Sequence, residues 1–218
     1  DIDVSVQDNS GSRKENVAWT YKGVTGYAPI FAYLGTHGYL LANELRPGSQ
    51  HSAKGAAAFT RRCLDLTGRL GLAPTDLLVR VDSAHDDKEY LELLLASGVH
   101  FLVKRNLRRE APEQYLALAR RLGDKQPSRD GKNVYRCVLS HRQPEGLEAA
   151  GLFVVVEVVE RLTDMDGQPL LIPELEVSTW WTNLPEDEAA CIELYRNHAT
   201  SEQFHAELKS DLGIERLP

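Results

Sequence analysis

A short apolar run at residues 77–81 constrains the fold of this 218-residue chain more than any other feature. The run is nearly continuous in apolar side chains, which is typical of a strand that a sheet buries on both faces. It follows a helical spacing of apolar residues at 56–72, and it stops at Asp82. A strand that returns parallel to an earlier strand after a helix needs a right-handed crossover. The run therefore predicts an α/β fold in which a buried strand ends on an acidic side chain.

Alternation and helical periodicity predict the remaining elements. Residues 1–6, 28–34 and 39–45 are expected to form an antiparallel meander. A helix at 87–97 and a strand at 99–104 follow the buried strand. Further along, the pattern predicts a helix at 112–122, a loop at 126–132, β-rich runs at 134–140, 152–161 and 174–181, and a long helix that opens at 185–188.

This order of elements predicts a mixed α/β fold with an insertion before its last helix. We expect residues 1–104 to form the first part of the core and residues 105–184 to form a mostly β insertion. The C-terminal helix at 185–218 is then expected to complete the core.

Composition narrows the setting in which the chain works. No stretch approaches the roughly 18 apolar residues of a membrane span, so we expect no membrane partner. Three separated cysteines argue against a disulfide framework and favour a reducing, cytoplasmic setting. Because the first residue is Asp1 and the only methionine is Met165, we expect a piece of a longer protein.

Charge is distributed unevenly along the chain. The formal net charge is −7, yet residues 104–142 carry 11 Lys and Arg against 4 Asp and Glu. This basic segment is either a solvated excursion or a surface that tracks a DNA backbone through salt-dependent phosphate contacts. The residues at its start that we expect to contact DNA are Lys104, Arg105, Arg108 and Arg109.

A stripe of polar side chains marks the last helix. At about 100° per residue, Tyr195, His198, Glu202 and Lys209 fall within roughly 60° of one another. Glu207 points roughly 140° away from Glu202. The stripe predicts one functional face on this helix.

Acidic residues from distant segments complement the stripe. Asp82 follows a buried strand, where functional groups of α/β sheets gather, although an aspartate there can also be a simple cap. Asp1 and Asp3 share one face of the first strand, and burying them without a cation or a hydrogen-bonded partner is costly. Together with Glu202 they would suit Mg²⁺ or Mn²⁺, and two such ions support phosphoryl transfer.

Residues 195–209 resemble the Y-x2-R-x3-E-x6-K signature of bacterial insertion-sequence transposases of the DDE class. Three of the four signature positions match, and His198 stands where arginine is usual. The likeness covers nearly the whole chain, since 1–3, 45–48 and 80–83 also fit the family pattern.

The resemblance implies a ribonuclease H-like mixed sheet flanked by helices, with a β-rich insertion among the 119 residues between Asp82 and Glu202. It implies that Asp3, Asp82 and Glu202 hold two Mg²⁺ or Mn²⁺ ions. Asp3 is preferred because it lies two residues before Ser5, and Asp1 stays an alternative.

In biological terms, the resemblance implies cleavage at transposon ends and strand transfer into target DNA. The partner is double-stranded DNA, the enzyme would be a homodimer when assembled on it, and the site of action would be the bacterial nucleoid.

The resemblance also suggests roles for residues outside the acids. Tyr195 and Lys209 would contact phosphates, whereas His198 offers a contact whose charge depends on pH. Trp180 and Trp181 either pack in the core or, as in transposases that cut through a DNA hairpin, stack on a flipped base.

Other functions stay open at this level. A metal-dependent nuclease of the same fold would cut DNA without strand transfer, and a non-catalytic DNA-binding fragment would explain the exchange at His198. A zinc or phosphohydrolase site at residues 85–87 is weakly supported because no helical His-x3-His pair adjoins a carboxylate. Residues 23–26 lack a nucleotide-binding loop signature.

Overall fold

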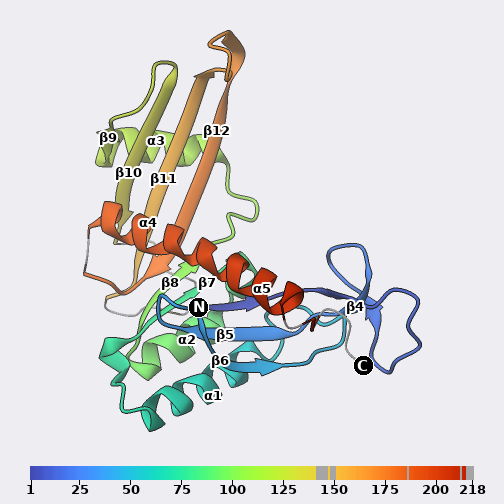
Figure 1. The fold of residues 1–218 in the computed structure, drawn as a ribbon. Coiled ribbons are helices and arrows are strands. Elements are labelled where there is room, and N and C mark those ends of the chain that lie inside the picture. Colours follow the sequence, from blue (N-terminus) through green and yellow to red (C-terminus); the bar gives the residue numbers. More distant parts are fainter. Residues whose placement is uncertain (141–146, 148–150, 186, 212, 215–218) are drawn as a thin grey trace. The chain divides into compact units, whose positions relative to one another are not determined.

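The computed structural model describes residues 1–140, 147, 151–185, 187–211 and 213–214, with only the backbone of residues 199–202. The chain divides into two compact units (Figure 1). Unit one contains residues 1–100 and 195–218, and unit two contains residues 101–194. In the described part, no helix combines the length and the apolar character that crossing a membrane requires.

The first sheet of unit one is the expected antiparallel meander. It has the strand order β1 (Ile2–Val4), β5 (Ile30–Leu34) and β6 (Tyr39–Glu44). In its register Asp3 lies opposite Phe31. The apolar residues of β1 and β5 are almost fully buried, so this sheet forms one side of the core of unit one.

A second, small sheet in unit one was not expected from the sequence. It has the order β2 (Gln7–Asp8), β4 (Thr25–Tyr27) and β3 (Ala18–Trp19). Gly26 sits in the middle strand, where an added Cβ would lie 1.9 Å from the carbonyl oxygen of Gln7. Only glycine lets β4 approach the backbone of β2 this closely.

Two helices cover the core of unit one. Helix α1 (Ala56–Arg69) buries Phe59 and Cys63 on one face, as its spacing predicts. It leads through a short turn to β7 (Leu78–Val81), which ends at Asp82. Helix α2 (Lys88–Ser97) starts at the cap residue Asp87 and stops at Gly98, whose φ of 68° favours glycine.

Unit two is built on a long antiparallel sheet. Its strands lie in the order β8 (His100–Lys104), β12 (Pro169–Thr182), β11 (Phe153–Thr163), β10 (Lys132–Leu139) and β9 (Asp124–Gln126). Each neighbouring pair is antiparallel. Strand β11 is buried from residue 154 to 160 because it has a partner strand on each side.

Helix α3 (Pro112–Leu122) packs on this sheet across β10 and β11 (Figure 1). Proline at its first position costs no hydrogen bond. Two arginines in its last turn interact favourably with the negative end of the helix dipole. Helix α4 (Glu188–Arg196) begins after Asp187, whose carboxylate accepts the backbone N–H of Ala190 at 2.7 Å.

The predicted long C-terminal helix is interrupted. Helix α4 ends at Arg196, a 3-10 turn spans Asn197–Ala199, and α5 runs from Thr200 to Ser210. Asparagine, threonine and serine side chains compete for backbone hydrogen bonds, which explains a break here. The mixed α/β class and the other predicted helices and strands are confirmed within a few residues, and β9 is an added strand.

Replacing Leu94 by alanine tests the core of unit one. This α2 side chain is fully buried, so we expect a loss of about 2–5 kcal/mol in the free energy of unfolding by urea. The matched control Leu70→Ala removes a side chain that is 63% exposed. Equal effects of the two substitutions would contradict this packing.

Candidate active site

A buried ion pair joins the first strand to β7 within unit one. Arg80 donates from Nε to Oδ1 of Asp1 at 2.7 Å and from a terminal nitrogen to Oδ2 at 2.8 Å. The Asp1 side chain is only 4% exposed. Both carboxylate oxygens of Asp1 are therefore committed to a cation, which makes Asp1 a poor candidate for holding a metal.

Asp3 has a different environment on the same face of β1. Its Oδ1 accepts the backbone N–H of Val4 at 2.7 Å, and its Oδ2 lies 3.2 Å from Nε2 of His205. The side chain is 24% exposed. Neither contact is to a lysine or an arginine.

Asp82 lies at the end of β7, where the sequence predicts it. Its Oδ1 accepts the N–H of Ala84 at 3.1 Å and lies 2.9 Å from Nδ1 of the buried His85. Burial acts to raise the pKa of Asp82, but the hydrogen bond and charge of His85 outweigh it and hold the pKa below its ordinary value. Asp82 is thus ionised at neutral pH, and it has no lysine or arginine partner in the described part.

The two aspartates converge on the same tyrosines. Burial, together with the charges of Asp3 and Asp82, raises the pKa of Tyr21 to about 12. Burial and the same two carboxylates also raise the pKa of Tyr195. The charges of Asp3 and Asp82 therefore both act on the hydroxyl groups of Tyr21 and Tyr195.

Two carboxylates with open oxygens and no basic partner fit a divalent cation. Oxygen ligands of this kind suit Mg²⁺ and Mn²⁺. Among the residues that the structure describes, however, no group of three histidine, cysteine or acidic side chains is arranged to hold a metal. The predicted third acid, Glu202, belongs to α5, and its side chain lies outside the described residues.

His198 is buried and faces Asp1. Its Nδ1 atom lies 3.1 Å from Oδ1 of Asp1, and the residue is 8% exposed. Burial lowers the pKa of His198 to about 4, so the imidazole is uncharged at neutral pH. In this arrangement His198 contributes no positive charge for a phosphate.

The other stripe residues lie close to the first strand. Lys209 donates from Nζ to the carbonyl oxygen of Val6 at 2.7 Å, and the ring of Tyr195 lies 5.6 Å from that of His198. Glu207 is exposed on α5. His198 and Lys209 of the stripe therefore contact Asp1 and Val6, which flank β1 on either side.

Three arginines of the basic segment in unit two bind acidic side chains. Arg105 contacts Glu110 at 2.6 Å and lies over the Trp181 ring at 5.2 Å. Arg120 and Arg136 bind the carboxylates of Glu160 and Glu157, which are buried in β11. These contacts neutralise three of the 11 positive charges counted from the sequence.

Of the four residues at the start of the basic segment that are expected to contact DNA, Arg108 and Arg109 are exposed and Lys104 is half-buried.

Trp180 and Trp181 are 5% and 4% exposed in β12. Their burial favours the core-packing interpretation over stacking on a base.

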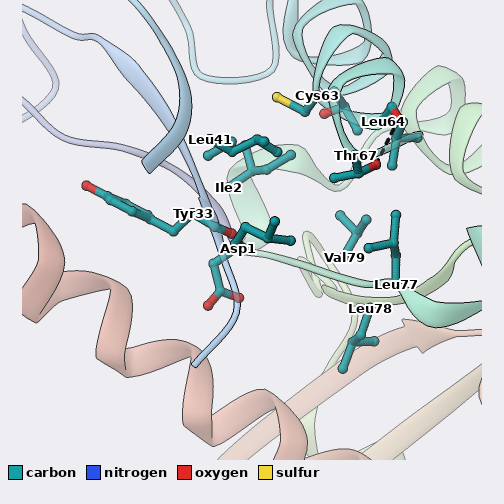
Figure 2. A pocket seen from close by; sticks show the side chains of 13 residues that line it. Asp1, Ile2, Tyr33, Leu41, Cys63, Leu64, Thr67, Leu77, Leu78 and Val79 are labelled. Atoms are coloured by element: carbon teal, nitrogen blue, oxygen red, sulfur yellow. Dashed lines mark hydrogen bonds between the residues drawn. The ribbon is translucent and has the colours of Figure 1, made fainter. Parts of the chain in front are cut away.

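A small cavity lies beside Asp1 in unit one (Figure 2). Its volume is about 50 Å³, and its lining is mostly apolar, with Ile2, Cys63 and Val79 among the residues that surround it. Figure 2 shows the Asp1 carboxylate pointing away from Leu41 and Cys63. Neither Asp3 nor Asp82 lines the cavity, so the candidate site lies outside it.

Sequence reasoning missed His205. The signal was present, because residues 198, 202, 205 and 209 follow the spacing of four, three and four that defines one helix face. Tyr33, which contacts His205 from β5, carries no signal in the sequence because its partner is 172 residues away.

Comparison with known families assigns the chain. The sequence model of the family described as transposase DDE domain group 1 matches residues 1–218. The chain therefore belongs to this family of DDE transposase domains.

Among solved structures, the chain is similar to a piggyBac transposase determined as a synaptic complex with hairpin DNA, with 11% sequence identity and a TM-score of 0.48. The similarity covers 96% of this chain and 39% of that one, so the chain spans well under half the length of that transposase. A comparison with curated proteins finds no match.

The buried His198 predicts a pH dependence of stability. Its pKa is about 4 in the folded state against an ordinary 6.5, so below pH 6.5 the unfolded state binds a proton that the folded state does not. We expect the free energy of unfolding to fall between pH 6.5 and 4, with up to roughly 3 kcal/mol from this group. The measurement is urea unfolding of the wild type and of His198→Gln at a series of pH values. The free energy of unfolding should depend less steeply on pH in the variant than in the wild type.

The exposed His37 provides the matched control. His37→Gln should leave the pH dependence of the wild type unchanged. If His198→Gln and the wild type lost stability in parallel on acidification, His198 would not be held uncharged.

Proposed function

We propose that this chain is the catalytic domain of a DNA transposase that cuts at transposon ends to free a 3′-hydroxyl and transfers that strand into target DNA. Family membership supports the transposase assignment. The observation that carries the chemistry is that Asp3 and Asp82, neither of which binds a lysine or an arginine of the described part, both act on the hydroxyls of Tyr21 and Tyr195. Phosphoryl transfer is otherwise a matter of positioning and charge stabilisation, which such a site provides.

In this proposal, unit one is a ribonuclease H-like core and unit two is its β-rich insertion. The β1-β5-β6 meander, α1, β7 and α5 supply the core elements. Asp3 on β1, Asp82 after β7 and Glu202 on α5 then stand on three separate elements of one unit. Rigid strands and helices hold such ligands more accurately than loops do.

We propose that these three acids hold two Mg²⁺ or Mn²⁺ ions. Bound ions of this kind activate an attacking oxygen and stabilise the leaving oxygen. The protein side chains have their own roles: the lowered pKa of Asp82 keeps it ionised, and His85 fixes the orientation of the Asp82 carboxylate through its 2.9 Å contact.

DNA contacts are proposed where charge is available. Tyr195 keeps its hydroxyl hydrogen because its pKa is raised, so it can donate to a phosphate beside the acids. Lys209 adds positive charge near β1, and Lys104, Arg108 and Arg109 extend the contact surface on unit two. We further propose a homodimer assembled on double-stranded DNA at the bacterial nucleoid.

Loss of either of two proposed metal ligands should abolish cleavage. Purified protein is incubated with Mg²⁺ and a linear duplex carrying the sequences that flank its gene. We expect Asp82→Asn and Glu202→Gln each to slow cleavage by roughly a thousandfold or more, because metal stabilisation is worth several kcal/mol. The control Asp166→Asn changes an exposed aspartate of unit two and should cut at the wild-type rate.

Wild-type rates in Asp82→Asn and Glu202→Gln, with folding verified by circular dichroism, would refute the proposed site. Pre-cut ends test the second step, because a transposase joins them to a target plasmid. Cleavage without joining would indicate a nuclease, and a wild-type protein that binds DNA without cutting it would indicate a non-catalytic fragment.

A further inference from the structure

His205 of α5 is buried in unit one, where it contacts Asp3 of β1 and Tyr33 of the neighbouring strand β5. Its Nε2 lies 3.2 Å from Oδ2 of Asp3, and its Nδ1 lies 2.8 Å from the hydroxyl oxygen of Tyr33. The imidazole makes edge contacts with the rings of Phe31 and Tyr33, each at 5.2 Å between centroids. Both ring nitrogens thus have a partner, and the ring is wedged in one orientation.

Hydrogen-bond chemistry fixes which nitrogen carries the hydrogen. A carboxylate only accepts, so Nε2 of His205 must be the N–H that donates to Asp3. In a neutral ring Nδ1 is then an acceptor, and the Tyr33 hydroxyl donates to it. Burial raises the pKa of Tyr33, which keeps this hydroxyl protonated. The tautomer follows from the network of partners.

Asp3 is held from both sides. Oδ1 accepts the backbone N–H of Val4, and Oδ2 accepts the imidazole N–H of His205. Two donors at fixed positions restrict rotation of the carboxylate, and neither donor is a lysine or an arginine. Lone pairs of both oxygens stay available on a side chain that is 24% exposed.

The same contact joins two elements of the proposed site. His205 belongs to α5, which also carries Glu202, whereas Asp3 belongs to β1. Lys209 and Phe204 tie α5 to the same region through the Val6 carbonyl and the Tyr33 ring. Of these contacts, only that of His205 reaches a proposed metal ligand.

We propose that His205, held by Tyr33, is a positioning residue that fixes the Asp3 carboxylate and the approach of α5 for divalent metal binding. The inference rests on the proposed function, since it assigns Asp3 to a metal. Hydrogen-bonded partners of metal-ligating carboxylates typically change metal affinity or activity by 10–100-fold when they are removed.

Calorimetric titration with Mn²⁺ tests this role directly. We expect His205→Leu to weaken Mn²⁺ binding by roughly 10- to 100-fold, because Asp3 loses its imidazole donor. His205→Gln keeps an N–H donor and should recover part of the affinity. Tyr33→Phe removes the hydroxyl alone and should weaken binding less than His205→Leu does.

Tyr27 offers a matched control for the tyrosine substitution. It is buried, and its hydroxyl donates to the carbonyl oxygen of Glu15 at 2.8 Å, away from the acids. Tyr27→Phe should bind Mn²⁺ like the wild type. Unfolding temperatures measured in parallel show whether a variant is merely less stable.

The outcomes separate this inference from the function on which it rests. If the wild type binds Mn²⁺ and Asp82→Asn abolishes binding, the metal site stands, and weakened binding in His205→Leu with partial recovery in His205→Gln supports the positioning role. Unchanged Mn²⁺ affinity in His205→Leu and Tyr33→Phe, with only a lower unfolding temperature, overturns the role and leaves the metal site intact. A wild type without Mn²⁺ binding overturns both.

Discussion

The ion pair between Asp1 and Arg80 is the contact on which the arrangement of unit one depends. Side chains alternate along extended backbone, so Asp3 shares a face with Asp1, and Asp82 shares one with Arg80. Because Arg80 binds Asp1 through two contacts of 2.7 and 2.8 Å, the carboxylates of Asp3 and Asp82 are expected on the same side of their strands. Removing one partner of a buried pair leaves an uncompensated charge and typically costs 3–5 kcal/mol.

Three aspartates in unit one each contact a histidine, with different consequences. His198 contacts Asp1, His205 contacts Asp3 and His85 contacts Asp82. Asp1 also binds Arg80, and its charge is satisfied within the protein. The other two carboxylates are oriented by hydrogen bonds and bind no lysine or arginine of the described part, and this distinction separates a structural acid from two acids that suit a metal.

The periodic spacing of apolar residues and the residue types at turns and helix caps predicted most of the fold. The meander, α1, β7 and α2 follow from apolar spacing and from cap residues such as Asp87 and Gly98. The small sheet escaped notice because strands of two or three residues show no alternation, and its close packing at Gly26 is a tertiary effect. The break at Asn197–Ala199 arises because local side-chain hydrogen bonds compete with the helical ones. Apolar spacing alone does not predict the outcome of that competition.

The candidate site was predictable only in part. Asp82 at the end of a buried strand carries a local signal, whereas the stripe was predicted for one continuous helix that the structure breaks at Asn197–Ala199. Counting charges could not show that Arg120 and Arg136 are paired with Glu160 and Glu157. Nor could spacing reveal that His198 is buried against Asp1, because that contact joins residues 197 positions apart.

Iron-directed cleavage of the backbone tests the central claim, a divalent metal site formed by Asp3, Asp82 and Glu202, most directly. Fe²⁺ bound in place of Mg²⁺ generates hydroxyl radicals with ascorbate and peroxide, and these cut the chain beside the metal. The account predicts fragments that end near residues 82 and 202, detected by mass spectrometry, and their loss in excess Mg²⁺ or in Asp3→Asn. Cuts only at other positions, or cuts that excess Mg²⁺ does not suppress, would contradict it.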